Sequence, residues 1–430
     1  MKPLSADVLR CRPSGGERVT AGHELALRYD ALFIDLDGVV YRGEQVIPAA
    51  PGVLERLRAL NAKLLFLTNN SARTPRQVAE RMQKLGVQAD PEEILTSALA
   101  TAAMLRREAS GAQKAYVIGE RGIREALERV GIEILDGEPE SAHLVVVGWD
   151  RSVDYAKLKT ASLLVERGAR LIATNPDASY PAPDGLWPGA GAILSAVTTT
   201  TGATPTLVGK PGRPLFQAAA EATGATRPLV VGDRLDTDIG GADAMEWDSL
   251  LVLTGASTPA SLLETSHVPT YVARDVAGLL DDVPPARFRQ ATPDDVAAIR
   301  SLLQAEGLQP DGLENRVDGT IVSGERPGEH GIDATACLQT EHGFAILRSV
   351  AVRKSLQGKG LGMLAVASAC ARARAQDLHH VSLFTEAATP FFERMGFRKV
   401  DRSELPEPVR VSSHAAEECA ATAVAMIRDL

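Results

Sequence analysis

Two aspartates, Asp35 and Asp37, lie at the end of a short apolar run. Residues 31–36 are apolar except for Asp35, and Asp37 follows directly. Gly38 follows them and permits a sharp turn, so both carboxylates can converge on one ligand. Such a pair suits a divalent cation, with one carboxylate left free to attack an electrophile. From this stretch alone, an acidic turn that merely ends a strand is an equally good interpretation.

Polar groups also follow a second apolar run, residues 63–68. Thr68, Asn69 and Asn70 supply hydroxyl and amide groups that can bind phosphate oxygens. Continuous apolar runs of this length are typical of buried parallel strands, and open α/β sheets place their active sites at the carboxyl ends of such strands. We therefore expect these groups to lie beside the two aspartates.

A third run, residues 229–231, opens into the sequence GDRLDTDIGGA. It brings Asp233 and Asp238 to the same predicted edge, whereas Asp236 is explained more simply as a solvated surface charge. Lys210, at a turn before a predicted helix, adds a positive charge. Together the runs supply a nucleophile, an acid, a hydroxyl group, a cation and metal ligands.

These motifs resemble, in order and spacing, the haloacid dehalogenase superfamily of phosphotransferases. The matching stretches are DxDG at 35–38, Thr68 with Asn69, Lys210 in GKP, and GDxxxTD at 232–238. The stretch ATNPD at 173–177, followed by PGAGAILSAV, is similar to the branch of NagD and the p-nitrophenyl phosphatases, which carries a large cap. The resemblance covers roughly residues 30–282. It implies an α/β fold with a Rossmann-like core and a large inserted α/β cap.

The resemblance implies hydrolysis of a small phosphate monoester in two steps. Asp35 would attack phosphorus to form an aspartyl-phosphate, while Asp37 would protonate the leaving alkoxide and then deprotonate the attacking water. Thr68 and Asn69 would hold the phosphoryl oxygens, and Lys210 would offset their charge.

Magnesium is also implied by the resemblance. Asp35, the main-chain carbonyl of Asp37 and Asp233 would bind Mg²⁺, and Asp238 would bind a coordinated water or act from outside the coordination sphere. Asn70, Gly189 and Gly191 are further candidates for contact with the substrate. Residues 189–191 do not form a dinucleotide loop, because a third glycine and a following acidic residue are missing.

The segment between the second and third motifs alternates helical and strand patterns. We predict helices at 92–107, 123–130 and 155–167, and strands at 115–118, 144–148 and 170–173. The pattern predicts a cap at residues 90–204, inserted between core parts at 30–89 and 205–282. Such a cap would exclude water and bind the part of the substrate beyond its phosphate. Residues 1–29 lack periodicity and predict a flexible leader.

Composition limits the class of protein. The chain has 430 residues, of which 45% are hydrophobic and 23% charged, enough for about three domains. Its net charge of -9 argues against nucleic acid as a partner and leaves a small phosphorylated metabolite. The four cysteines have no metal-binding spacing and predict free thiols. With no apolar run long enough for membrane insertion and no signal peptide, we expect a soluble cytoplasmic protein.

A further domain, residues 287–430, is predicted after a linker at 281–285 that contains prolines. A helix begins near Thr292, and strands follow near 319–322, 334–339 and 344–352. The sequence QGKGLG at 357–362 then opens an apolar helix that continues to about residue 375. A strand, a glycine loop and a helix can bind a pyrophosphate through backbone amides at the positive end of the helix.

This domain resembles the α+β GNAT acetyltransferases, in which the pattern Q/R-x-x-G-x-G/A binds acetyl-CoA. The candidates for contact with CoA or acetyl-CoA are Val350, Val352, Gln357, Gly358, Gly360 and Gly362. Phe392 stands where many members carry the tyrosine that protonates the CoA thiolate, so the loop favours CoA binding more than acetyl transfer. A structural or dimer-contact role, within a homo-oligomer, is at least as compatible.

Three classes of function therefore remain. The first is a Mg²⁺-dependent phosphatase. The fusion of a capped phosphatase to a GNAT-like domain resembles actinobacterial glycerol 3-phosphate phosphatases, which favours glycerol 3-phosphate as the substrate. This resemblance also implies a role in recycling glycerophospholipid head groups. Phosphoglycolate, pyridoxal phosphate, nucleotide monophosphates and p-nitrophenyl phosphate are alternative substrates. The second class is a bifunctional protein that also acetylates an amine. The third is a phosphatase regulated by a CoA-binding module.

Overall fold

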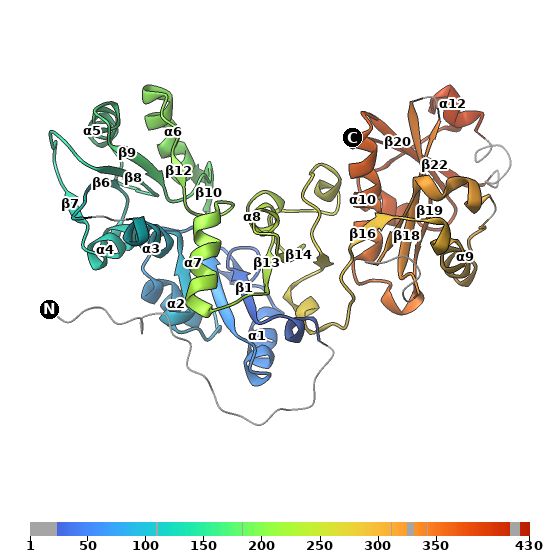
Figure 1. Ribbon diagram of the computed structural model, residues 1–430, viewed down its shortest axis with the longest axis horizontal. Helices are drawn as coiled ribbons and strands as arrows, with labels where there is room; N and C mark the ends of the chain where they lie inside the picture. The colour runs from blue at the N-terminus through green and yellow to red at the C-terminus, as the bar shows by residue number, and fades with distance from the viewer. Residues whose placement is uncertain are drawn as a thin grey trace. The chain divides into compact units, whose positions relative to one another are not determined.

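The computed structural model describes residues 24–108, 111–182, 184–310, 312–324, 331–341, 343–412 and 422–430 (Figure 1). The predicted leader lies outside this range up to residue 23, and a short 3₁₀ helix, η2 (Leu25–Arg28), follows. The chain divides into two compact units, one up to Gly255 with Asp275–Asp281, and one of Ala256–Arg274 with Asp282–Leu430. The domain boundaries that we predicted stay predictions.

The first unit contributes five strands to a sheet, and they pair in parallel in the order β14-β13-β1-β4-β5. The strands are β1 (Ala31–Asp35), β4 (Leu64–Thr68), β5 (Ile94–Thr96), β13 (Pro228–Gly232) and β14 (Asp248–Val252). Every residue of β1, β4 and β13 is buried, as expected for a sheet that is covered on both faces. The three strands predicted from apolar runs are therefore confirmed.

Helices connect these strands and pack against the sheet. They are α1 (Ala50–Ala59), α2 (Pro75–Lys84), α3 (Ser97–Glu108), α7 (Arg213–Thr223) and α8 (Gly240–Ala244). Helix α2 begins with a capping box, in which the Thr74 side chain accepts from the amide of Gln77 and the Gln77 side chain accepts from the amide of Thr74. A short hairpin, β2 (Tyr41–Arg42) and β3 (Gln45–Val46), follows β1.

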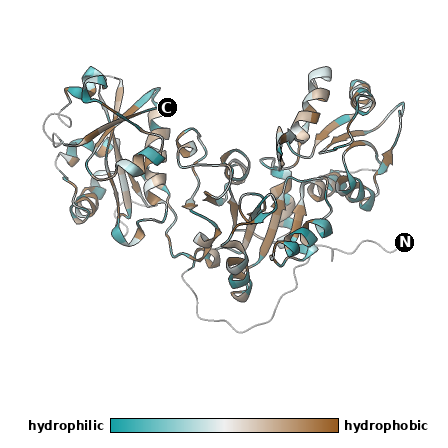
Figure 2. Cartoon of the chain, turned by 180° about the vertical axis from the view of Figure 1, so that it is seen from behind, coloured by the Kyte–Doolittle hydropathy of each residue, from teal (hydrophilic) through white to brown (hydrophobic). Residues whose placement is uncertain are grey.

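The inserted cap has its own parallel sheet in the order β12-β9-β8-β6-β7. Its elements are β6 (Lys114–Ile118), α4 (Arg121–Arg129), β7 (Glu133–Leu135), β8 (Leu144–Val147), α5 (Tyr155–Glu166), β9 (Arg170–Ala173), β10 (Ser179–Ala182), β11 (Gly185–Pro188), α6 (Ala190–Thr201) and β12 (Thr206–Leu207). Alternate strand residues enter two cores: Val146 packs with α3 and α4, and Val147 with α5 and α6. In Figure 2 the sheet strands are largely brown, consistent with this burial.

One helix prediction in this region was wrong at its start. Ile94–Thr96, within the helix predicted from Glu92, forms strand β5, and α3 begins only at Ser97. The apolar residues 94, 95 and 98 are compatible with a helix and with a short strand. The strand forms because β4 offers its free backbone hydrogen-bonding groups to residues 94–96. The predicted cap boundary at residue 90 therefore precedes a strand of the core sheet.

The second unit contains a mixed sheet in the order β16-β17-β18-β19-β20-β22-β21. The strands of this sheet are β16 (Phe288–Gln290), β17 (Thr320–Ser323), β18 (Ala334–Glu341), β19 (Phe344–Val352), β20 (His380–Thr385), β21 (Arg398–Val400) and β22 (Val424–Asp429). The same unit also contains strand β15 (Tyr271–Ala273), which lies outside this sheet. Its helices are α9 (Val296–Ala305), α10 (Leu361–Ala375), α11 (Thr389–Arg394) and α12 (Glu407–Arg410). Only β19 and β20 pair in parallel within this sheet.

The predicted fold class is confirmed: a parallel α/β core, an inserted α/β cap and a C-terminal domain with a mixed sheet. The sequence patterns found β17, β18, β19 and α10, but we did not predict β16, β20, β21 and β22. Cys337 and Cys370 are free thiols, and the other two cysteines lie outside the described residues. In the part of the chain that the structure describes, no helix combines the length and the apolar character needed to cross a membrane.

Candidate active site

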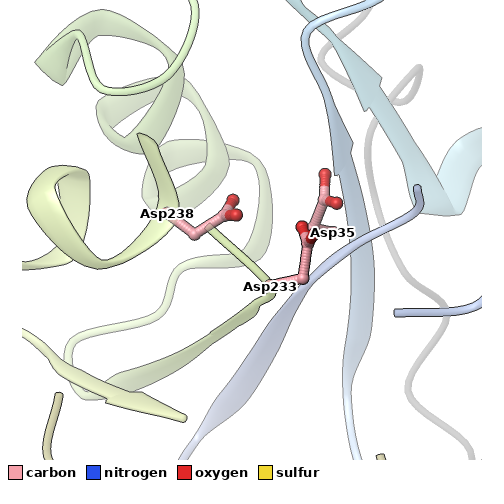
Figure 3. A group of neighbouring side chains, drawn as sticks. All are labelled: Asp35, Asp233 and Asp238. Carbon is pink, nitrogen blue, oxygen red and sulfur yellow. The ribbon is translucent and has the colours of Figure 1, made fainter. Parts of the chain in front are cut away.

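Three carboxylates meet at the carboxyl edge of the core sheet (Figure 3). Asp35 is the last residue of β1, Asp233 follows β13, and Asp238 lies in the π-helical turn η4 (Leu235–Ile239). One oxygen from each lies within 4.8 Å of the others, and the three residues are only 8%, 3% and 1% exposed. Three buried anions at such short range require a cation.

Lys210 supplies that positive charge. Its Nζ donates hydrogen bonds to Asp35 Oδ1 and, at 2.7 Å, to Asp238 Oδ1. Burial opposes the charge of Lys210, but the Asp238 and Asp35 carboxylates outweigh burial and raise its pKa. Burial raises the pKa of Asp35 well above its usual range, with help from Asp238 and Asp233, while Lys210 acts in the opposite direction.

Two glycines make room for Asp233. Gly38 has a φ of +87°, and a Cβ placed on it would lie 2.4 Å from Asp233 Oδ2. A Cβ on Gly255 would lie 1.8 Å from the same oxygen. Any side chain at either position would displace the carboxylate, so the sharp turn predicted at Gly38 also serves to seat Asp233.

Asp37 lies beside this cluster and is partly exposed. Burial raises its pKa, and the charge that opposes this rise most strongly is that of Arg81 in α2. The Arg81 guanidinium lies over the ring of Tyr41, 4.6 Å from its centroid, and donates to the Gly43 carbonyl at 2.7 Å. Arg81 is thus held near Asp37, a position that no sequence motif indicated.

Asn69 connects the two predicted motifs around Thr68 and Lys210. Its Oδ1 accepts from the backbone N–H of Lys210 at 2.7 Å, and its Nδ2 donates to the Lys210 carbonyl at 3.1 Å. The Thr68 hydroxyl accepts from the Asn70 N–H at 3.1 Å, and Asn70 Oδ1 accepts from the N–H groups of Ala72 and Arg73. These bonds fix the turn that carries the polar side chains.

The cap contributes two residues to this turn that we did not assign to the site. Asn175 Nδ2 donates to the Asn69 carbonyl at 2.7 Å, and Asn69 Nδ2 donates to Asp177 Oδ2 at 3.1 Å. Both residues belong to the stretch ATNPD, whose resemblance was the signal that could have found them. Burial raises the pKa of Asp177, with the Asn69 bond opposing it.

Gly189 and Gly191, the predicted substrate contacts, lie at the start of α6. Their N–H groups donate to the carbonyls of Ala178 and Asp177, and a Cβ on Gly191 would lie 2.1 Å from the Pro176 carbonyl oxygen. Close packing of α6 on this loop therefore accounts for both glycines. Asp236 is exposed and pairs with Arg234, as expected for a surface charge.

The predicted CoA residues lie in the second unit. Val350 and Val352 are in β19, Gln357 and Gly358 lie between that strand and α10, Gly360 is the N-cap of α10, and Gly362 is in its first turn. Phe392 of α11 is buried, with its ring centroid 5.6 Å from that of Phe397.

The parallel sheet with a buried lysine among three aspartates at its carboxyl edge defines a class of hydrolases. Residues 32–133 match the haloacid dehalogenase-like hydrolase family, residues 207–279 the HAD-hydrolase-like family, and residues 299–397 the acetyltransferase (GNAT) family. The chain belongs to the haloacid dehalogenase-like hydrolase family and is a phosphatase of the NagD and p-nitrophenyl phosphatase type with a C-terminal GNAT domain.

Particular relatives agree with this assignment. The chain is 39% identical to the acid sugar phosphatase of Staphylococcus aureus over 58% of its own length and 96% of that protein. A glycerol phosphate phosphatase of Mycobacterium tuberculosis, solved with magnesium, aligns with a TM-score of 0.69 and 27% identity over 87% of this chain and 99% of the other. A p-nitrophenyl phosphatase of Archaeoglobus fulgidus aligns with a TM-score of 0.55 and 34% sequence identity. That alignment covers 59% of this chain and 99% of the other.

Proposed function

We propose that this protein hydrolyses glycerol 3-phosphate to glycerol and phosphate in a Mg²⁺-dependent reaction through an aspartyl-phosphate. The observation that carries the proposal is the buried contact of Lys210 with Asp35 and Asp238 beside Asp233. A surface ion pair would not require such burial. Phosphoryl transfer through an aspartyl-phosphate needs this combination of a carboxylate nucleophile and cationic stabilisation.

In the first step Asp35 attacks phosphorus. Lys210 bonds to its Oδ1, which leaves Oδ2 to form the new bond while the bond from phosphorus to the glycerol oxygen breaks. The Lys210 ammonium then lies close enough to offset charge on the transferring group. Thr68 and Asn69, fixed at the carboxyl end of β4, hold the phosphoryl oxygens.

Asp37 supplies and recovers the proton. Because burial raises its pKa, Asp37 keeps its proton to a higher pH than an ordinary carboxyl group and can donate it to the leaving alkoxide. In the second step Asp37 takes a proton from water, the water oxygen bonds to phosphorus, and the bond to Asp35 breaks. The same residue thus acts as acid and then as base.

The carboxylates also fit a divalent cation. Asp35, Asp233 and Asp238 offer clustered oxygen donors, which Mg²⁺ prefers, and the Mycobacterium tuberculosis relative was solved with magnesium. Asp35, Asp233 and the Asp37 carbonyl would hold the ion, with Asp238 in contact through water. The ion would neutralise charge on the phosphoryl oxygens.

One comparison supports glycerol 3-phosphate over other esters. The alignment with the glycerol phosphate phosphatase extends over 87% of this chain, whereas the alignment with the p-nitrophenyl phosphatase covers 59%. The glycerol phosphate phosphatase therefore resembles this chain over more of its length. A sugar phosphate is the second candidate, because the Staphylococcus aureus relative is an acid sugar phosphatase at 39% identity.

The test is phosphate release from a panel of esters by the full chain. Glycerol 3-phosphate, a sugar phosphate, phosphoglycolate, pyridoxal phosphate, a nucleoside monophosphate and p-nitrophenyl phosphate are each assayed with Mg²⁺ and with EDTA. We expect the highest kcat/KM with glycerol 3-phosphate, and no turnover in EDTA. A clear preference for another ester would refute the substrate, and undiminished release in EDTA would refute the metal.

A further inference from the structure

The glycine loop before α10 packs against the chain's own backbone. Gly360 is buried with a φ of +87°, and a Cβ on it would lie 2.2 Å from the carbonyl oxygen of Val272 and 3.0 Å from the carbonyl carbon. A glycine is therefore required there whether or not a ligand binds. The carbonyl oxygen also places partial negative charge beside the N-terminus of a helix, where a pyrophosphate would need positive potential.

The segment that carries Val272 packs against this unit. Residues 256–274 cluster with the C-terminal unit, and its parts η5 (Ser261–Leu263) and β15 both contact α10. Leu262 and Leu263 are 1% and 0% exposed. The buried Arg428 of β22 donates to the Ala260 carbonyl at 3.2 Å and to Glu264 at 2.9 Å.

Helix α10 needs such a cover. Its buried residues are Leu361, Leu364, Ala365, Val366, Ala367, Ala369, Cys370 and Ala373. Consecutive buried positions such as 364–367 face all sides of a helix, so the sheet alone cannot cover them. Strands β17, β18 and β19 contact the helix, and the segment 256–274 supplies the additional contacts.

Two side chains of the loop, Gln357 and Lys359, already have partners. Glu306 accepts from the N–H of Lys354 at 2.9 Å and from Gln357 Nε2 at 2.8 Å, which places a carboxylate beside the loop. The Lys359 ammonium donates to the Asp282 carbonyl at 3.1 Å. A pyrophosphate bound at this loop would meet the negative charge of Glu306.

We propose that this GNAT domain does not bind CoA, because the segment 256–274 of the same chain packs directly against the glycine loop and the Glu306 carboxylate lies beside it. The residues present do not fit the cofactor that the family implies. Phe392, which has no proton to donate, agrees with the loss of acetyl transfer. The domain is then a structural element whose core is completed by the segment. This inference does not depend on the substrate of the phosphatase.

The first test is isothermal titration of the full chain with CoA and with acetyl-CoA, using the unmodified protein. We expect no saturable heat up to about 1 mM ligand and no rise in the midpoint of thermal unfolding. Saturable binding with a Kd below this concentration would overturn the proposal.

A matched pair of glycine variants tests the packing itself. Gly358 has a φ of +78°, but a Cβ on it would have no neighbouring atom within 4 Å, so Gly358→Ala measures backbone strain alone. Gly360→Ala adds the clash with Val272. By hydrogen exchange, amides of α10 should exchange about tenfold faster in Gly360→Ala than in Gly358→Ala. Equal exchange in the two variants would contradict the close packing.

Discussion

The two units use buried carboxylates in opposite ways. Burial and neighbouring carboxylates raise the pKa of Asp35, which lies at the core site with Asp233 and Asp238. In the second unit Arg289 donates two hydrogen bonds to Asp295, at 2.7 and 2.8 Å, and the pKa of Asp295 is held well below its usual range. The first arrangement gathers several buried carboxylates around one lysine, as a catalytic or metal site requires, whereas the second pairs one carboxylate with one arginine and stabilises the fold.

Glycines show the same difference. Gly38 and Gly255 make room for the Asp233 side chain, so their absent side chains permit a functional group to be placed. Gly360 makes room for the Val272 backbone, so its absent side chain permits packing. A glycine motif therefore indicates a close approach, but the partner that approaches decides whether the motif has a role in binding.

The largest effect should come from Asp35→Asn. An amide oxygen lacks the charge needed to attack phosphorus, so we expect kcat to fall by at least about 10³-fold. The thermal midpoint should not fall, because the substitution removes a buried negative charge from a cluster of like charges. Asp236→Asn, at an exposed residue of the motif at 232–238, is the control and should retain activity. Full turnover by Asp35→Asn would show that another group is the nucleophile.

Gly255→Ala sharpens the contrast between the two kinds of glycine. A Cβ 1.8 Å from Asp233 Oδ2 must displace that carboxylate, so the Mg²⁺ concentration for half-maximal activity should rise about 10–100-fold. Protection against thermal unfolding by Mg²⁺ should shift to higher concentration in parallel. Gly52→Ala in α1, where nothing lies within 4 Å, should leave both curves in place. Unchanged Mg²⁺ dependence in Gly255→Ala would refute the metal role of Asp233.

Arg428→Met tests the attachment of the segment 256–274. The variant loses bonds to Met395, Ala260 and Glu264, which should destabilise the second unit by about 2–3 kcal/mol. All three tryptophans lie in the first unit, so their fluorescence should not report this change, whereas hydrogen exchange in α10 should accelerate. Arg398→Met, at an exposed arginine of β21, is the control. Unaltered exchange in Arg428→Met would weaken the case for a firmly held segment.

Asp295→Asn should have the smallest effect, about 2 kcal/mol at pH 7. Because the folded-state pKa of Asp295 is lowered, its stabilisation is present above the unfolded pKa of about 4 and is lost as the pH falls below that value. The difference in free energy of unfolding between wild type and variant should therefore shrink below about pH 4. Chemical denaturation followed by hydrogen exchange in α9 measures it. A difference that stayed constant down to pH 2 would contradict the lowered pKa.

Local sequence predicted the polar ends of the core strands because each apolar run ends directly before them. Asp35, Thr68 and Asp233 were found in this way. Ile94–Thr96 was assigned to a helix because a three-residue strand has too few residues to show a period. Arg81 was missed because no motif connects a residue of α2 with Asp37.

The sequence by itself determined which residue types stand at the ends of the strands, since apolar periodicity and turn chemistry are local properties. Only the tertiary structure decided how those residues act. The pKa of Asp35 depends on burial and on charges from the loop after β13, from η4 and from the loop before α7, all distant in the chain. The partner of Gly360 is a carbonyl of β15, which no pattern within 357–362 specifies. Contacts between distant segments are set by packing, and packing decides whether a motif binds a ligand or the protein itself.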